Sequence, residues 1–403
     1  MAKRGLDALG DLRGKRVFVR VDFNVPLRDG PRGPEVADDY RLEMALPTLR
    51  ALRERGARLV LGSHLGRPKG KGPEPAWSMR PVVGRLEALL GAPVRFVDDV
   101  CGDAAKAAAE ALAPGEVLLL ENLRFERGEK DGDEGFARRL AALADAYVND
   151  AFGVSHRGDA SVTALARLLP AAAGELVRTE LERLQPLRDG TAPRPLVVVL
   201  GGGKLADKIP VLEALVPKVD GIFVGGGMAY TFLAAMDKPI GRSRYEPDLR
   251  EKAQQILELA RERARTTGCE FVLPRDHVVA RGPDDLDGYA VVDEIPDDLM
   301  ALDIGPATIA DFTRRLRGVK TVFWNGPLGM FEKKPFHLGT HYVASFLGCS
   351  RGIHTVVGGG DSAAAARELG VADTIGWVST GGGASLELVQ GLPLPGIDAL
   401  PDA

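Results

Sequence analysis

The sequence has few cysteines: Cys101, Cys269 and Cys349 are the three among 403 residues. They lie far apart, no CxxC pair is present, and no histidine stands at a zinc-ligand spacing from them. Reduced thiols are the simplest interpretation, so the sequence argues against a disulfide scaffold, a structural zinc site and redox chemistry.

Long hydrophobic runs and an excess of one charge are also missing. No apolar stretch approaches the length of a membrane span, and the first residues contain no apolar signal region. Charged residues make up 27% of the chain, but the formal net charge is only −4, which gives no strong field toward nucleic acids or membranes. We therefore expect a cytoplasmic protein that binds neither, and the charge-rich surface favours a monomer.

The sequence does contain an alternation of short apolar runs with alanine- and leucine-rich helical stretches. In the first half, apolar runs end in polar residues, and stretches such as 42–55 and 136–144 separate them. This alternation is typical of βαβ units, so we predict an α/β fold with mostly parallel sheets. The second half repeats the plan, with strands expected near 196–200, 222–224, 271–273, 300–304, 321–324, 353–357 and 375–379.

The length of the chain predicts two domains, because 403 residues are too many for one ordinary core. Residues 174–184 are apolar at Leu176, Val177, Leu181 and Leu184, which suits a helix that connects the domains. We expect an N-terminal domain at 1–173, an interdomain helix and hinge at 174–190, a C-terminal domain at 191–385 and a tail at 386–403.

The tail contains the segment GLPLPG at 391–396. We expect this segment not to be helical, because proline disrupts helices. Its leucines need cover, so the tail is predicted to pack back toward the N-terminal domain.

Four glycine triplets follow short apolar runs in the second half, at 201–203, 225–227, 358–360 and 381–383. Each pattern predicts a strand, a glycine turn and a helix, which would put backbone amides and the positive end of a helix at the carboxyl edge of a sheet. Glycines punctuate such turns in any α/β domain, but four triplets favour a ligand site. A phosphorylated ligand is the first hypothesis.

The first half instead carries charged and polar side chains where its apolar runs end. Arginine grips carboxylates and phosphates in bidentate geometry, so several arginines at one sheet edge point to a small ligand with more than one negative charge. The candidate binding residues in this half are Asp22, Asn24, His64, Arg67, Arg124 and Arg157.

The second half adds Lys204, Lys208 and Asp361 to its glycines, which is typical of a domain that binds a nucleotide and Mg²⁺. No GxxxxGK[ST] motif and no protein-kinase HRD and DFG set are present. Residues 358–363 match a dinucleotide-binding pattern, but the acidic residue expected about 20 residues later is missing. A nicotinamide dehydrogenase therefore remains a minor alternative.

Eight motifs run through the chain from the first predicted strand to the last helix. They are RVDFNVP (20–26), SHLGRP (63–68), LLENLRF (119–125), DAFGVSHR (150–157), LGGGKLADKI (200–209), WNGPLGMFE (324–332), GGGDSAAA (358–365) and STGGGASLELV (379–389). In this order they resemble the phosphoglycerate kinase family. The resemblance implies two Rossmann-like domains joined by a helical hinge.

The resemblance also implies an activity, the reversible transfer of the acyl phosphate of 1,3-bisphosphoglycerate to Mg-ADP, which gives 3-phosphoglycerate and ATP. It assigns the sugar-acid substrate to Asp22, Asn24, Arg41, His64, Arg67, Arg124 and Arg157. It assigns the nucleotide to Lys204, Lys208, Gly226, Asn325, Glu332, Gly358, Gly359, Gly360, Asp361 and Ser362, with Asp361 as the metal ligand. The implied catalytic residues are Arg41, Lys204, Lys208, Gly360 and Gly382, the two glycines acting through their amides.

This chemistry needs no general base, because the nucleophile in the direction of ATP consumption is a carboxylate that is already ionised. A non-catalytic sensor of phosphorylated metabolites is a second alternative, although Arg41, Lys204, Lys208 and Asp361 are all in place. Two positions depart from the family's usual pattern: Asp159 stands where a histidine is frequent, and Ala307 where a lysine is frequent. Both bear on substrate affinity.

Overall fold

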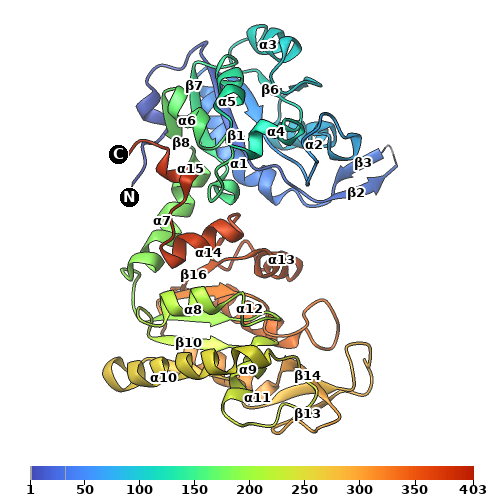
Figure 1. The fold of residues 1–403 in the computed structure, drawn as a ribbon, viewed down its shortest axis with the longest axis vertical. Coiled ribbons are helices and arrows are strands. Elements are labelled where there is room, and N and C mark those ends of the chain that lie inside the picture. The colour runs from blue at the N-terminus through green and yellow to red at the C-terminus, as the bar shows by residue number, and fades with distance from the viewer. Residues whose placement is uncertain (1, 32) are drawn as a thin grey trace. The chain divides into compact units, whose positions relative to one another are not determined.

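The computed structural model describes residues 2–31 and 33–403, which form two compact units. Unit 1 contains the chain up to Glu182 together with Pro393–Ala403, and unit 2 contains Arg183–Leu392. The helix α7 (Glu175–Asp189) runs through the boundary at 182/183 (Figure 1). Among the described residues no helix is both long and apolar enough to cross a membrane.

Unit 1 is built around a six-stranded sheet in the order β5-β6-β4-β1-β7-β8, and every neighbouring pair is parallel. Val17, Phe18 and Val19 of the central strand are fully buried, as expected for a parallel sheet that is covered on both faces. The strands are β1 (Arg16–Val21), β4 (Arg58–Gly62), β5 (Val94–Phe96), β6 (Val117–Leu119), β7 (Ala146–Asp150) and β8 (Ala171–Ala173).

Helices connect these strands and bury their apolar faces against the sheet. Leu42, Leu49 and Leu52, for example, lie on one side of α1 and are fully buried in the core of unit 1. The helices are α1 (Tyr40–Glu54), α2 (Arg80–Leu90), α3 (Asp103–Glu110), α4 (Arg127–Lys130), α5 (Glu134–Ala141) and α6 (Ala164–Leu168), and β2 (Leu27–Gly30) and β3 (Gly33–Val36) form a separate hairpin.

Unit 2 repeats the plan with a parallel sheet in the order β11-β10-β9-β15-β16-β17. Its strands are β9 (Leu196–Leu200), β10 (Gly221–Val224), β11 (Glu270–Val272), β15 (Thr321–Asn325), β16 (His354–Val357) and β17 (Trp377–Val378). Its helices are α8 (Ile209–Leu215), α9 (Met228–Ala235), α10 (Arg250–Thr267), α11 (Pro306–Leu316), α12 (Leu338–Cys349), α13 (Gly360–Glu368) and α14 (Gly383–Gln390).

The strand predicted near 300–304 forms, but it does not join the parallel sheet. It is β14 (Met300–Ile304), which pairs antiparallel with β12 (His277–Ala280), and β12 pairs antiparallel with β13 (Ala290–Val292). The sequence pattern did not predict β12 and β13. A short apolar run looks the same in a parallel and an antiparallel sheet, because only its pairing partner differs.

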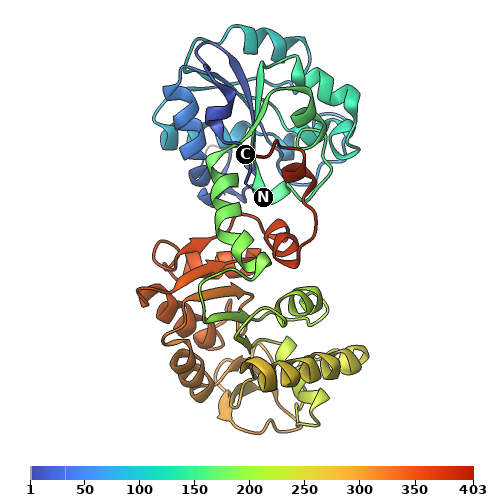
Figure 2. The ribbon, with the colours of Figure 1, turned by 90° about the vertical axis from the view of Figure 1, so that its left-hand side faces the viewer.

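The end of the chain returns to unit 1. Gly396 donates its amide to the carbonyl of Ser155 and accepts from Asn149 Nδ2, and Lys3 Nζ donates to the carbonyl of Leu400. Residues near both ends of the chain lie side by side in the two views (Figures 1 and 2).

The prediction that 391–396 contains no helix was wrong, since α15 (Pro395–Asp398) begins at a proline. Proline is tolerated at a first helical position because the amide there has no helical partner.

Candidate ligand sites at the two sheet edges

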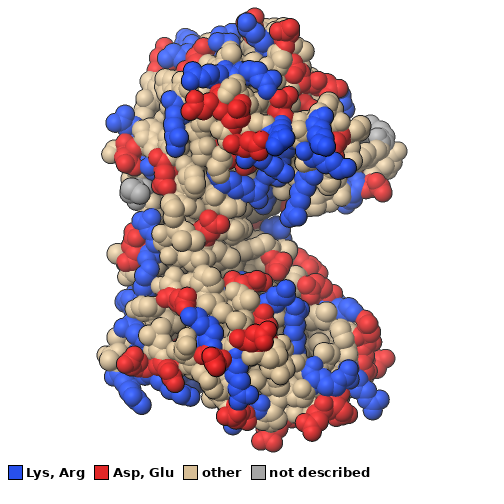
Figure 3. Space-filling view, in the orientation of Figure 1, with Lys and Arg blue, Asp and Glu red and all other residues tan. Residues whose placement is uncertain are grey.

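The carboxyl ends of β1, β4, β6 and β7 lie at one edge of the unit 1 sheet, because these parallel strands are neighbours. Asp22 directly follows β1, and the loops after β4, β6 and β7 contain His64, Arg124 and Arg157. Lys and Arg atoms also gather around α4 and α2 on the surface of this unit (Figure 3). The sheet order therefore brings together the polar segments that lie far apart in the sequence.

Asp22 is the central acid of this edge and is 7% exposed. Arg41, the second residue of α1, forms an ion pair with its Oδ2 through Nη1. Burial alone would raise the pKa of Asp22, but Arg41, His64 and Arg20 together hold that pKa below its ordinary value. Asp22 is therefore an ionised carboxylate that points Arg41 into the edge of the sheet.

His64 is neutral at pH 7. Burial, and after it the charges of Arg20, Arg124 and Arg157, hold the pKa of His64 well below its ordinary value despite the opposing effect of Asp22. Arg20 Nη2 lies 3.4 Å from His64 Nδ1. A guanidinium can only donate, so Nδ1 accepts and the ring proton lies on Nε2. His64 can thus donate a hydrogen bond to an anion through Nε2.

Arg20 contacts His64, and Glu129 in turn contacts Arg20. The sequence patterns did not identify either residue as part of the site. Arg20 is fully buried, with Nε donating to Ser161 Oγ at 2.8 Å and Nη2 lying 3.7 Å from Glu129 Oε1. Glu129 is also fully buried, and it accepts from the amide and the hydroxyl of Ser161 at 3.0 and 2.6 Å. Burial raises the pKa of Glu129 and Arg20 opposes this effect. These partners fix the guanidinium that faces the histidine.

Arg124 lies on the short helix η3 (Leu123–Phe125) and is 6% exposed. Asn122 caps η3 by accepting the amide of Arg124 and holds the neighbouring loops by donating to the carbonyls of Leu65 and Trp77, each at 2.8 Å. Arg124 Nη1 donates to the carbonyl of Gly66 at 3.1 Å. Burial lowers the pKa of Arg124, which remains a cation at neutral pH.

The other predicted residues of unit 1 are less constrained. Asn24 Oδ1 accepts the amide of Gly66 at 2.8 Å, so this asparagine orders the loop after β4. Arg157 is half-buried and its Nε donates to Nε2 of His156, whereas Arg67 is exposed. The guanidinium groups of Arg157 and Arg67 are thus more accessible than that of Arg124.

In unit 2 three loops pack backbone against backbone. The amides of Gly201, Gly202 and Gly226 donate to the carbonyls of Asn325, Pro327 and Leu328 at 2.8 to 2.9 Å. A Cβ atom at Gly201 would lie 2.0 Å from the oxygen of Pro327. Only glycine fits such an approach, so the first two triplets serve at least to join β9, β10 and β15 at their carboxyl ends.

Asn325 connects these loops to the third triplet. Its Oδ1 accepts from Lys208 Nζ, and its Nδ2 donates to the carbonyl of Gly358 at 2.6 Å. The hydroxyl of Ser362 accepts the amide of Gly326. Burial lowers the pKa of Lys208, while the carboxylates of Asp207 and Asp361 oppose this effect. The lysine is therefore held at the same sheet edge as the glycine turns.

The last two triplets open α13 and α14. Gly359 and Gly382 have positive φ values of 92° and 52° and precede these helices directly. First-turn amides of a helix have no partner inside the helix, so the helix starts at Gly360 and Gly383 can bind an anion. Asp361 lies in the first turn of α13, and Lys204, Asp361 and Glu332 all have exposed side chains.

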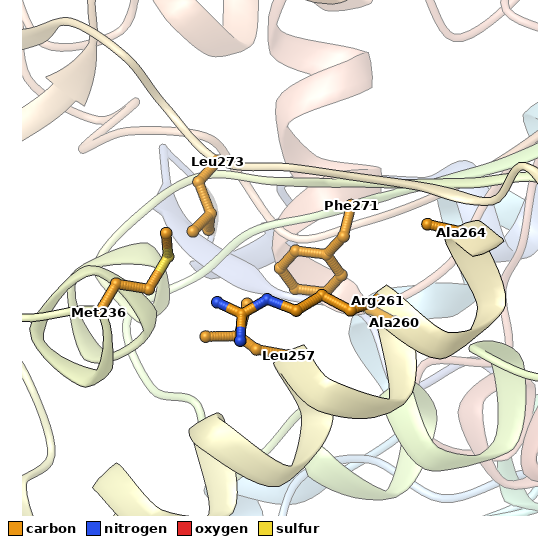
Figure 4. A pocket seen from close by; sticks show the side chains of 7 residues that line it. All are labelled: Met236, Leu257, Ala260, Arg261, Ala264, Phe271 and Leu273. Atoms are coloured by element: carbon orange, nitrogen blue, oxygen red, sulfur yellow. The ribbon is translucent and has the colours of Figure 1, made fainter.

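An apolar hollow of about 310 Å³ lies elsewhere in unit 2. Met236, Leu257, Phe271 and Leu273 surround it, and Arg261 reaches over it from α10 (Figure 4). None of the residues around it is a predicted site residue, and it lacks the glycine turns that suit a phosphate. The two sheet edges therefore remain the candidate sites.

Two parallel sheets with an arginine-rich edge in one unit and glycine turns in the other define a Rossmann-like α/β protein whose sheet edges suit anionic ligands. A family model described as phosphoglycerate kinase matches residues 6–392. A phosphoglycerate kinase of Anaeromyxobacter dehalogenans (strain 2CP-C) is 50% identical over 403 residues, with 99% of both chains covered.

Solved structures agree with the sequence comparison. The phosphoglycerate kinase of Coxiella burnetii matches with a TM-score of 0.84 and 36% identity over 96% of both chains. That of Pyrococcus horikoshii OT3 matches with a TM-score of 0.82 and 30% identity over 98% of both chains. The chain belongs to the phosphoglycerate kinase family, and it is a phosphotransferase of glycolysis.

Proposed function

We propose that this enzyme transfers the acyl phosphate of 1,3-bisphosphoglycerate to ADP, giving 3-phosphoglycerate and ATP, and that it catalyses the reverse reaction as well. The observation that carries the proposal is the division of chemistry between the units. Unit 1 gathers His64 and a set of guanidinium groups, which suits a small acid with a phosphate, and unit 2 gathers glycine turns and Lys208, which suits the phosphates of a nucleotide.

In this proposal the sugar acid binds to unit 1. Arg67, Arg124 and Arg157 surround its phosphate, His64 donates through Nε2, and Asn24 orders the adjoining loop. Asp22 holds Arg41 by an ion pair, so that this guanidinium faces the reacting carboxyl group. The full set proposed for this substrate is Asp22, Asn24, Arg41, His64, Arg67, Arg124 and Arg157.

The nucleotide binds to unit 2. The amides at the starts of α13 and α14, including those of Gly360 and Gly382, and the ammonium group of Lys208 donate to the phosphoryl oxygens, where negative charge is spread in the transition state. Because the accepting carboxylate is already ionised, these groups stabilise charge and no residue has to remove a proton. The full nucleotide set is Lys204, Lys208, Gly226, Asn325, Glu332, Gly358, Gly359, Gly360, Asp361 and Ser362.

Mg²⁺ is the proposed metal, and Asp361 is its proposed ligand. Across residues 2–31 and 33–403 no three His, Cys, Asp or Glu side chains form a group that would hold a metal by themselves. Mg²⁺ in kinases is usually held by one or two carboxylates together with substrate phosphates and water, and the exposed carboxylate of Asp361 beside the start of α13 fits that pattern. When bound, Mg²⁺ neutralises phosphate charge.

Turnover requires the substrates bound to the two units to meet, since phosphoryl transfer is a direct displacement. We propose that α7 is part of the hinge that permits this approach, and that the enzyme acts as a monomer in the cytoplasm. Solution scattering should therefore show compaction when 3-phosphoglycerate and a non-hydrolysable ATP analogue bind together. Unchanged scattering with both ligands bound would contradict closure.

The reaction itself is tested with ATP, 3-phosphoglycerate and Mg²⁺, using a dehydrogenase and NADH to consume the acyl phosphate. We expect turnover that requires all three components and a higher Mg²⁺ requirement in the variant Asp361→Asn. The matched control is Asp373→Asn, which also lies in unit 2 but outside the nucleotide set. Binding of both substrates without turnover would instead support the metabolite-sensor alternative.

A further inference from the structure

A third buried acid, Asp159, lies among the arginines of unit 1. Its side chain is only about 7% exposed, and its Oδ2 lies 3.6 Å from Nη2 of Arg124. This separation is longer than a hydrogen bond. Within the described residues, Asp159 Oδ2 and Arg124 Nε are both buried without a hydrogen-bond partner. A carboxylate and a guanidinium therefore face each other at this edge with bonding capacity unused.

The other two acids of the cluster differ from Asp159. Asp22 is paired with Arg41, and Glu129 accepts two hydrogen bonds from Ser161. The carboxylate oxygens of Asp22 and Glu129 thus have hydrogen-bond or ion-pair partners within the protein. Of these three acids, Asp159 is the one with a buried oxygen that has no donor among the residues described by the structure.

The backbone fixes Asp159 in this position. Its carbonyl oxygen accepts from the amides of Val162 and Thr163, each at 3.0 Å, and from the hydroxyl of Thr163 at 3.1 Å. The amide of Ala160 donates to the carbonyl of Glu129 at 2.8 Å. These bonds fix the peptide group that follows Asp159, which limits how far the carboxylate can withdraw when another anion arrives.

We propose that Asp159 sets the affinity of unit 1 for phosphorylated substrates by competing with them for Arg124, an inference that rests on the proposed function of this edge. In the empty enzyme the carboxylate neutralises a buried guanidinium. A bound phosphate takes over that partner and then lies close to a second negative charge, which weakens its binding. Asp159 therefore stabilises the free enzyme at the expense of the complex.

The variant Asp159→Asn keeps the shape of the side chain and removes its charge. We expect it to bind 3-phosphoglycerate and inorganic phosphate about tenfold more tightly in calorimetry, and to show the gain in the KM for 3-phosphoglycerate rather than in kcat. The affinity for ATP should stay as in the wild type. The unliganded variant should melt at a lower temperature, because Arg124 loses its counter-charge.

Two further variants test whether the expected gain in affinity comes from removing the charge of Asp159. One keeps the charge and changes the size of the side chain, and the other removes a different acidic residue. Asp159→Glu keeps the charge and should not tighten phosphate binding. Asp131→Asn removes an exposed acid that pairs with Arg127 rather than with Arg124, and it should leave both affinities unchanged. If Asp159→Asn does not fold, Asp159→Ala gives the same neutral comparison.

The outcomes also separate this inference from the proposed function. Tighter binding of both anions by Asp159→Asn supports the inference, and unchanged or weaker binding with normal ATP affinity overturns it. If inorganic phosphate binds more tightly to the variant while 3-phosphoglycerate binds to neither protein, the inference holds and the proposed substrate is wrong. If neither anion binds to any variant, both are overturned.

Discussion

Arg41 forms an ion pair with the buried carboxylate of Asp22, at the start of α1 and the end of β1. We expect Arg41→Ala to lower kcat by about 10³-fold or more, the scale of losing an arginine that stabilises a phosphoryl-transfer transition state. The coupled assay described above measures this loss. Arg50→Ala, an exposed arginine of the same helix, is the control and should retain activity. Activity of Arg41→Ala within tenfold of the wild type would remove Arg41 from the mechanism.

Lys208 and Asn325 form a second functional pair, 117 residues apart in the sequence. Lys208→Ala should lower kcat by about 10²- to 10³-fold, the effect of removing one donor to the developing charge. Asn325→Ala should have a smaller effect, because it removes the partner of the ammonium group and the donor to the Gly358 carbonyl but leaves the charged group itself in place. In the double variant the losses should not add, since both act through one contact. Additive losses would show that the residues act separately, and the exposed Lys320→Ala is the control.

His64 predicts a pH dependence of stability. Its pKa in the folded state lies well below 6.5, so the unfolded chain binds a proton first as the pH falls. The stabilisation from neutral His64 is complete above about pH 6.5 and decreases below it, by up to about 1.4 kcal/mol at one pH unit below the unfolded pKa. Urea unfolding at pH 7.0 and 5.5 should show this decrease in the wild type and in His354→Gln, whose histidine is exposed, but less of it in His64→Gln. Equal decreases in all three proteins would contradict a buried neutral His64.

Gly226 tests the backbone contacts between the glycine turns. It has a φ of +64°, and a Cβ atom there would lie 2.7 Å from both the nitrogen and the oxygen of Gly202. Gly226→Ala should therefore lower the free energy of unfolding by more than 1 kcal/mol and weaken nucleotide binding. Gly84→Ala is the matched control, because Gly84 lies in α2 with open space around it and an ordinary φ. It should stabilise the protein by about 0.5 to 1 kcal/mol, and equal effects of the two changes would contradict the geometry.

The location of the candidate sites followed from simple rules, since polar residues after apolar runs mark strand ends and parallel strands end at the same edge. This is how Asp22 and His64, 42 positions apart, could be expected to meet. The rules fail for Arg20 and Glu129. Arg20 lies between Val19 and Val21 in an otherwise buried part of β1, and Glu129 lies on a four-residue helix. No local pattern indicates that two distant charged residues are buried together.

The antiparallel sheet of unit 2 was missed for a different reason. The residues of β12, from His277 to Ala280, are buried, but those of β13 are largely exposed and follow a charged loop. A three-residue exposed strand has no clear alternation in the sequence, because it is stabilised by pairing with β12 rather than by a face in the core. The positions of strands could be predicted where the sequence contained a clear apolar run.

The return of residues 393–403 to unit 1 has a consequence for synthesis. A ribosome makes most of unit 1 first, then all of unit 2, and only then the segment that supplies the contacts of Gly396 with Ser155 and Asn149 and of Leu400 with Lys3. The half that is made first is thus completed last. A nascent chain that stops before residue 393 lacks part of unit 1, even when all of unit 2 has been translated. The contacts that complete unit 1 therefore form only after residues 393–403 have been made.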